Sequence, residues 1–330
     1  MPNIITHKIF GEEVIALLEK SSDLHKQEIL RMIRRHEHLF YIGTNGPDFL
    51  FFHNAKPWQV MKSHQIAKIG SVLHREQVND FYEGALQAIR SQQDETIKER
   101  MIVYFMGHLC HWALDKTTHP YIFYRTGNCK GKSASMHHRF ESMMDAMMLK
   151  RYHQTTVRHY PQYEITTYDE KMLQAIARVY VPATKAALRI DLKVYDIRKA
   201  LDDWYDVQKL LYLPSERAMT LLQQFEKKVN QDWYLSGYIV PEHVDETYDV
   251  LNLDHTLWYH PCTLRLSSTA SFIDLFEEAL GVASEALKVA FQDLKDETFG
   301  LGNILHEQAY DSGMSPDHVM KHFDMIYDDM

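Results

Sequence analysis

Apolar residues recur every three or four positions along most of the chain, and this spacing places them on one face of an α-helix. The pattern predicts helices over residues 11–20, 23–42, 76–92, 99–115, 134–153, 169–189, 195–213, 215–233 and 271–294. Runs that alternate apolar and polar residues are short and isolated, and the best of them is YEITTY at residues 163–168. The sequence therefore predicts an all-α chain.

Several local signals predict where the helices begin and end. Ser271 precedes FIDLFEE as a candidate N-cap. Pro120 is expected to end the helix before it, because the residue before a proline avoids the helical region, and His119 would then lie at a helix C-terminus. Two longer irregular segments, residues 43–58 and 232–270, are candidates for functional loops.

No repeat, low-complexity tract or flexible linker divides the chain, so we expect a single all-helical domain over residues 1–330. Within it, residues 1–160 form a histidine-rich half that holds the candidate metal site. Residues 161–330 form a C-terminal helical extension.

Composition narrows the possible partners. Lys and Arg total 36 against 45 Asp and Glu, a formal charge of −9, so no nucleic-acid partner is expected. The three cysteines are too few for a disulfide framework and fit a reducing compartment. No segment approaches the roughly 20 apolar residues that span a bilayer, and no secretory signal is evident at the N-terminus. We therefore expect a cytoplasmic protein with at most peripheral membrane contact.

The excess of histidines, 20 in all, directs attention to their spacing. In the apolar stretch YFMGHLCHWALDKTTHPYIFY, residues 104–124, His111, Asp115 and His119 follow one another at intervals of four. Helical residues four apart have Cβ atoms about 5–6 Å apart, which suits two ligands of one metal ion. Asp115 lies between two imidazoles and could bridge neighbouring ions.

A second segment, MHHRFESMMD, offers His137 and Glu141 at the same spacing, with His138 and Glu141 as the competing pair. A single His-x-x-x-Asp pair is more often a surface hydrogen bond than a metal site. Here, however, the first segment is embedded in apolar residues, where buried polar groups need partners, and the second pair supplies matching ligand chemistry. The spacing therefore predicts a metal site.

Several segments together resemble the zinc-dependent phospholipase C family of bacteria. They are GHLCHWALDKTTHPY, the following HHRFE, the preceding GTNGPDFLFFHNAKPW and the opening MPNIITHKIFG, which cover residues 1–150 in motif form. DHTLWYHP and SFIDLF look like the C-terminal part of intracellular members.

The resemblance implies a multi-helix bundle of the phospholipase C type, with extra C-terminal helices, around one to three Zn²⁺ ions. Carried over position by position, it implies these metal ligands: His7, Asp48, His74, His111, Asp115, His119, His137 and Glu141. Asp48, in the GPD loop, is also the candidate catalytic residue that helps to activate water. His74 is the preferred histidine after that loop, with His53 and His64 as alternatives.

The sequence thus favours a metal-dependent hydrolase of a phosphodiester or phospholipid substrate. One alternative is a structural or metal-binding helical protein without phospholipase activity, and another is a related nuclease. A closed four-ligand shell would favour a structural role, whereas an open coordination position would favour catalysis.

Overall fold

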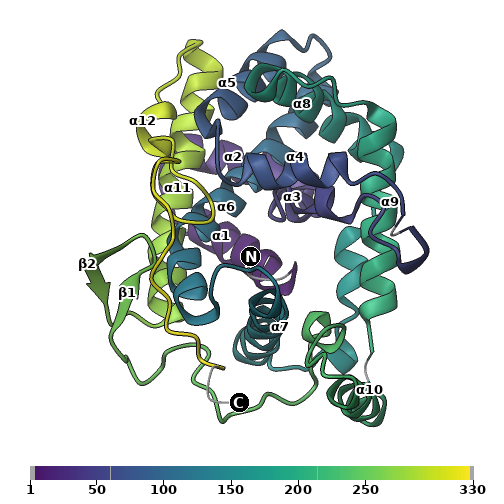
Figure 1. Cartoon of the computed structure of the whole chain (residues 1–330). Coiled ribbons are helices and arrows are strands. Elements are labelled where there is room, and N and C mark those ends of the chain that lie inside the picture. Colours follow the sequence, from purple (N-terminus) through teal and green to yellow (C-terminus); the bar gives the residue numbers. More distant parts are fainter. Residues whose placement is uncertain (1–3, 60, 214, 328–330) are drawn as a thin grey trace.

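The computed structural model describes residues 4–59, 61–213 and 215–327. Most of the described chain is helical, as predicted (Figure 1). The α-helices are α1 Ile4–Glu19, α2 Leu24–Arg35, α3 Glu37–Gly43, α4 Gln65–Leu73, α5 Val78–Ser91, α6 Glu95–Thr126, α7 Lys132–His153, α8 Glu170–Leu188, α9 Val194–Leu211, α10 Glu216–Lys228, α11 Phe272–Asp296 and α12 Gly302–Leu305. The first three residues of the motif MPNIITHKIFG lie outside the described residues.

Short elements complete the chain. The 3₁₀ helices are η1 Asp48–Phe52, η2 Pro57–Gln59, η3 Val157–His159, η4 Gln162–Thr166 and η5 Ser236–Tyr238. YEITTY, the best strand candidate, overlaps η4 instead. The antiparallel strands β1 Trp258–His260 and β2 Thr263–Ser268 lie within the segment 232–270, which was expected to be irregular.

Helix α6 forms the centre of the molecule. Every residue from 101 to 115 is buried, which is the pattern of a helix enclosed on all sides. Helices α1, α3, α7, α8 and α11 all pack against it. Figure 1 shows α11 along one edge of the molecule and α9 along the opposite edge, with α1 and α7 between them. Side chains on α6 are therefore held in fixed positions by neighbours on every side.

The prediction that Pro120 ends its helix is wrong. Helix α6 continues through Pro120 to Thr126, so His119 lies inside the helix and not at its C-terminus. A proline cannot donate to the carbonyl four residues earlier, here that of Lys116. Gly313 covers this carbonyl so closely that a Cβ at position 313 would lie 2.3 Å from the oxygen. The freed acceptor is thus enclosed by a later part of the chain.

Other predicted boundaries are confirmed or refined. Ser271 caps α11: its hydroxyl accepts from the amide of Asp274, whose carboxylate accepts from the amide of Ser271. The predicted helix over residues 23–42 is divided into α2 and α3 at His36, where φ is −136° and ψ is 39°. In the part of the chain that the structure describes, no helix is long and apolar enough to cross a membrane.

A contact between two glycines sets the position of the first irregular segment, residues 43–58. A Cβ at Gly43 would lie 2.5 Å from the carbonyl oxygen of Tyr104, and one at Gly107 would lie 2.3 Å from that of Phe40. The backbones of α3 and α6 therefore touch. Gly46, with φ of +49°, continues this approach, since a Cβ there would lie 2.2 Å from the His111 ring.

We predict that Gly107→Ala destabilises the protein by about 1–3 kcal/mol, because the added methyl must push two backbones apart. Gly281→Ala is the matched control, since no atom lies within 4 Å of a Cβ at that position in α11. There, alanine should stabilise the helix by up to about 1 kcal/mol. Urea unfolding of both variants measures the difference. A Gly107→Ala variant as stable as the parent would contradict the close contact.

Candidate metal centre

One face of α6 carries the centre of the candidate site. His111, Asp115 and His119 are all fully buried, as their spacing predicts for a single helix face. Nε2 of His111 lies 3.0 Å from Oδ2 of Asp115, and Nε2 of His119 lies 3.8 Å from Oδ1. The aspartate thus lies between two imidazoles.

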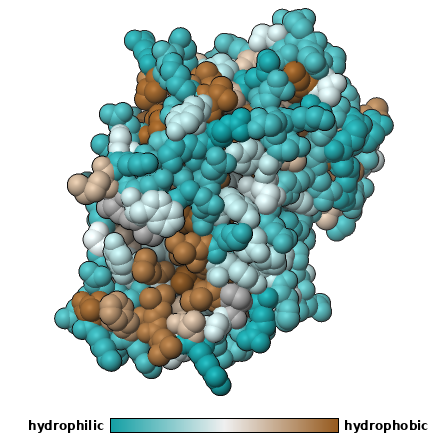
Figure 2. Space-filling model, turned by 90° about the vertical axis from the view of Figure 1, so that its right-hand side faces the viewer, coloured by the Kyte–Doolittle hydropathy of each residue, from teal (hydrophilic) through white to brown (hydrophobic). Residues whose placement is uncertain are grey.

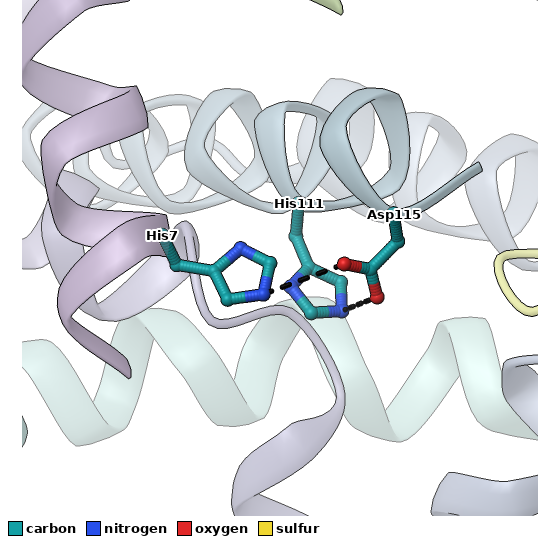
Figure 3. A group of neighbouring side chains, drawn as sticks. All are labelled: His7, His111 and Asp115. Carbon is teal, nitrogen blue, oxygen red and sulfur yellow. Dashed lines mark ion pairs between the residues drawn. The ribbon is translucent and has the colours of Figure 1, made fainter. Parts of the chain in front are cut away.

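His7 joins this group from α1 (Figure 3). Its Nε2 lies 3.4 Å from Oδ1 of Asp115, and its ring stacks on that of His111 with centroids 4.4 Å apart. Asp145 of α7 fixes the first turn of α1, because its carboxylate accepts the amides of Ile5 and Thr6 at 3.1 and 2.8 Å. That contact holds the helix that carries His7 against α7.

Asp48 and His74 form a second group around His111. Oδ1 of Asp48 lies 3.1 Å from Nε2 of His74 and 3.7 Å from Nε2 of His111. Of the three histidines considered after the GPD loop, His74 is thus the one in contact with Asp48. His53 is buried elsewhere, with Lys199 and Asp203 among its charged neighbours, and neither His53 nor His64 joins a metal-like group in the described chain.

The His137–Glu141 pair lies on α7. Nε2 of His137 is 2.9 Å from the Glu141 carboxylate, closer than Nδ1 of His138 at 3.5 Å. The ring of Phe123 lies close to both histidines, with centroids 4.8 Å from His137 and 5.6 Å from His119. The pair therefore lies beside the α6 group.

Hydrogen bonds fix which ring nitrogen of these histidines carries the proton. Nδ1 of His111, His119 and His74 lies 3.2, 2.9 and 2.7 Å from the carbonyl oxygens of Thr44, Tyr310 and Gly70, respectively. A carbonyl oxygen only accepts, so each Nδ1 must carry a hydrogen. In the neutral ring, Nε2 is then an unprotonated lone pair.

Nδ1 of His137 also carries a hydrogen, which it donates to a hydroxyl in place of a carbonyl. The Thr126 hydroxyl donates to the Ile122 carbonyl at 2.7 Å and must therefore accept from Nδ1 of His137 at 2.8 Å. Its Nε2 is thus the lone pair that faces Glu141. Four imidazoles, from α6, α7 and the C-terminal end of α4, share this orientation.

These lone pairs face carboxylate oxygens, which also only accept when the carboxyl group is ionised. Both oxygens of Asp115 and Nε2 of His111 and of His119 are buried without a hydrogen-bond partner. Facing acceptors repel unless a cation lies between them. Two ligands of one tetrahedral zinc, each at about 2.0–2.2 Å, lie about 3.3–3.6 Å apart. The N···O distances within the groups, 3.0 to 3.8 Å around Asp115, bracket that separation. The residues present therefore fit zinc.

A cavity of about 590 Å³ opens beside these groups. Asp48, His74, His137 and Glu141 line it on the side of the candidate centre. Its other walls are largely apolar and include residues of η1 and α9 and the residue before η5: Phe52, Trp204, Val207, Leu211 and Leu235. The candidate ligands thus lie at the wall of a space that a substrate could enter.

A family model described as zinc dependent phospholipase C matches residues 6–189. The chain belongs to the zinc-dependent phospholipase C family. Searches among curated proteins and among solved structures gave no match. The matched residues contain every candidate ligand, whereas α9, α10, α11 and the C-terminal segment lie beyond them.

Burial in this phospholipase C fold keeps two imidazoles in the form that binds metal. It lowers the pKa of His119 and of His137 well below the usual value near neutrality. Burial also raises the pKa of Asp115, against the opposing attraction of His111. Placing an anionic carboxylate here without a cation is therefore unfavourable, and a bound ion would remove that penalty.

Sequence reasoning missed the groups that orient the ligands. Tyr310, far along the chain, accepts the Nδ1 hydrogen of His119 through its carbonyl and donates its amide to the carbonyl of His74 at 2.8 Å. No local pattern marks such a residue. His108 is a core histidine: both ring nitrogens are hydrogen-bonded, to the hydroxyls of Tyr82 and Tyr180, each at 2.9 Å.

We predict that His111→Gln weakens zinc binding by more than the roughly 10- to 100-fold that loss of an outer hydrogen-bond partner costs. His111 belongs to both groups of candidate ligands, whereas His108, one helical turn away, has no free nitrogen. His108→Gln is therefore the control and should retain zinc. Competition with a fluorescent chelator gives both affinities. Equal zinc affinity in the two variants would contradict the assignment of His111.

We also predict that His119 and His137 are neutral at pH 6.5 in the metal-free protein, with the hydrogen on Nδ1. Burial lowers the pKa of both rings, so they stay unprotonated at a pH where an exposed histidine is half protonated. Two-bond ¹H–¹⁵N correlation spectra of the imidazoles identify the tautomer directly. A hydrogen on Nε2 of either ring would contradict the facing-acceptor geometry.

Proposed function

We propose that the protein is a zinc-dependent phosphodiesterase that hydrolyses phospholipids in the manner of a phospholipase C. The observation that carries this proposal is the set of buried imidazole lone pairs that face carboxylate oxygens beside a cavity with apolar walls. Family membership supports the hydrolase class and the metal. The apolar walls support a substrate with hydrocarbon chains.

Three sets of residues would hold the metal. They are His7, His111 and Asp115; Asp48, His74 and His111; and His119 with His137 and Glu141. His111 belongs to two of these sets, and Asp115 of the first set lies 3.8 Å from His119 of the third, so up to three ions would be held in one region. Zinc held there would acidify a coordinated water and neutralise charge on the phosphoryl oxygens.

The chain's own residues supply position and a proton acceptor. Asp48 lies at the cavity wall, held by the turn at Gly46 and Pro47, with one oxygen directed at His74 and His111. From there it can accept a proton from an attacking water, as a general base does. The buried face of α6 excludes bulk water behind it, which strengthens electrostatic interactions at the site.

The alternative of a purely structural metal site is less well supported. A structural zinc has a closed shell of protein ligands, whereas here Asp48, His74, His137 and Glu141 border an open cavity. A nuclease is also less well supported, because the chain carries a net charge of −9 and the cavity wall includes a single Arg or Lys among the described residues.

We predict that the zinc-loaded protein releases diacylglycerol from monomeric short-chain phospholipids and that a chelator abolishes this activity. Asp48→Asn should lower kcat by about 10²- to 10⁴-fold, the usual contribution of a general base. Zinc content is measured in parallel, so that loss of metal is separated from loss of the base. Asp254→Asn, an exposed aspartate, is the control.

The same assay separates the alternatives. A protein that binds zinc stoichiometrically but hydrolyses none of the lipids would favour the structural interpretation. Cleavage of single-stranded DNA faster than any lipid would favour a nuclease. Either result would overturn the proposal.

A further inference from the structure

Arg75 and Asp311 line the cavity as an ion pair, beside the candidate metal ligands and their neighbour His138. Nε of Arg75 donates to Oδ2 of Asp311 at 2.8 Å. Arg75 is the one Lys or Arg among the described residues that line the cavity. It is therefore the cavity's one permanently positive side chain.

The pair is fixed to the candidate metal centre by the backbone. Arg75 directly follows His74, and Asp311 directly follows Tyr310, whose amide donates to the His74 carbonyl at 2.8 Å. Arg75 is therefore next to the candidate metal ligand His74, and Asp311 is next to Tyr310, which orients the ring of His119. Arg75 and the candidate ligands Asp48 and His74 line the same cavity.

The ion pair uses one edge of the guanidinium and leaves the rest available. Neither Nη group of Arg75 has a hydrogen-bond partner in the described chain, and the side chain is 57 % exposed. A guanidinium whose orientation is fixed at Nε presents its remaining N–H groups in the geometry that suits a carboxylate or a phosphate. Asp311 acts here as a positioning residue.

The part of the cavity wall that α9 provides differs in character. Trp204, Val207 and Leu211 of α9 line it, and Leu210 lines it while remaining 58 % exposed. Figure 2, which faces this side of the molecule, shows apolar side chains gathered on its lower part. An amphiphile in the cavity would place its hydrocarbon against α9 and its polar head against Arg75. The two walls thus orient the substrate across the metal centre.

We propose that Arg75, positioned by Asp311, binds a second anionic group on the ligand whose phosphate lies at the metal centre. The ligand class is a phosphate linked through a few atoms to a carboxylate or to another phosphate, as in a serine head group. The inference rests on the proposed function for the position of the first phosphate. A head group with an ammonium alone lacks the group that Arg75 recognises.

O-phosphoserine and phosphoethanolamine test this proposal, because they differ only by a carboxylate. Titration calorimetry of the zinc-loaded full chain should show phosphoserine binding about 10- to 100-fold more tightly, the effect of one charge-assisted hydrogen-bonded pair. Arg75→Ala should bring the ratio of the two affinities close to one. Asp311→Asn should reduce the ratio by a smaller factor, because it frees the guanidinium without removing it.

Arg35→Ala is the matched control. Arg35 also binds a carboxylate through Nε, that of Glu99 at 2.7 Å, and its side chain is 56 % exposed, but it lies away from the cavity. This variant should keep the parent's ratio. Equal affinity of the parent for both ligands, or an Arg75→Ala variant that keeps the ratio, would overturn the proposal.

Hydrolysis distinguishes a lipid from a free phosphorylated compound as the source of this chemistry. Dihexanoyl phosphatidylserine should exceed dihexanoyl phosphatidylethanolamine in kcat/KM, and the ratio should fall in Arg75→Ala. If neither lipid is hydrolysed but calorimetry gives the expected ratio, the phospholipase proposal fails while the Arg75 site stands for a free phosphorylated ligand. Lipid hydrolysis without serine preference would overturn the Arg75 inference alone.

Discussion

The structure depends on a conflict between buried acceptors that a bound cation would resolve. Four imidazoles donate their Nδ1 hydrogens to backbone carbonyls or a hydroxyl, which turns four Nε2 lone pairs toward carboxylate oxygens. Protonating all four rings would also remove the repulsion, but it would place charge on His119 and His137, whose pKa values burial lowers. A divalent ion satisfies the same atoms without that cost. Under the proposed assignment, hydrogen bonds that look like ordinary packing would thus prepare this region to bind metal.

The fold supplies these hydrogen bonds from distant parts of the chain. The contact between Gly43 and Gly107 brings α3 against α6, so that the Thr44 carbonyl reaches His111. The C-terminal segment returns to α6, so that the Tyr310 carbonyl reaches His119. Each orienting group therefore depends on a tertiary contact. Metal binding and the packing of α6 should stabilise one another, since ligands oriented in advance lose little freedom when an ion binds.

Most of the fold that could be predicted from the sequence came from helical periodicity, because that periodicity is a local property of the sequence. It predicted α6 and α7 and the four-residue spacing that places Asp115 between His111 and His119 on one face. The resemblance to the family pointed to Asp48, and the structure then places His74 beside it. The path of α6 through Pro120 and the role of Tyr310 were not predictable from the sequence. Both depend on the C-terminal segment, which is far away along the chain: His119 and its partner Tyr310 are 191 positions apart.

If the proposed function holds, the residues matched by the family model would carry the metal chemistry, and residues beyond the match would contribute to substrate selection. All candidate ligands lie within residues 6–189, whereas Trp204, Leu211 and Asp311, which form cavity walls, lie beyond them. Walls that contribute no ligand can change without disturbing the ions. Tyr310 and Asp311 limit this independence, because neighbouring residues orient His119 on one side and Arg75 on the other. A change in this part of the C-terminal segment would therefore affect the metal and the head group together.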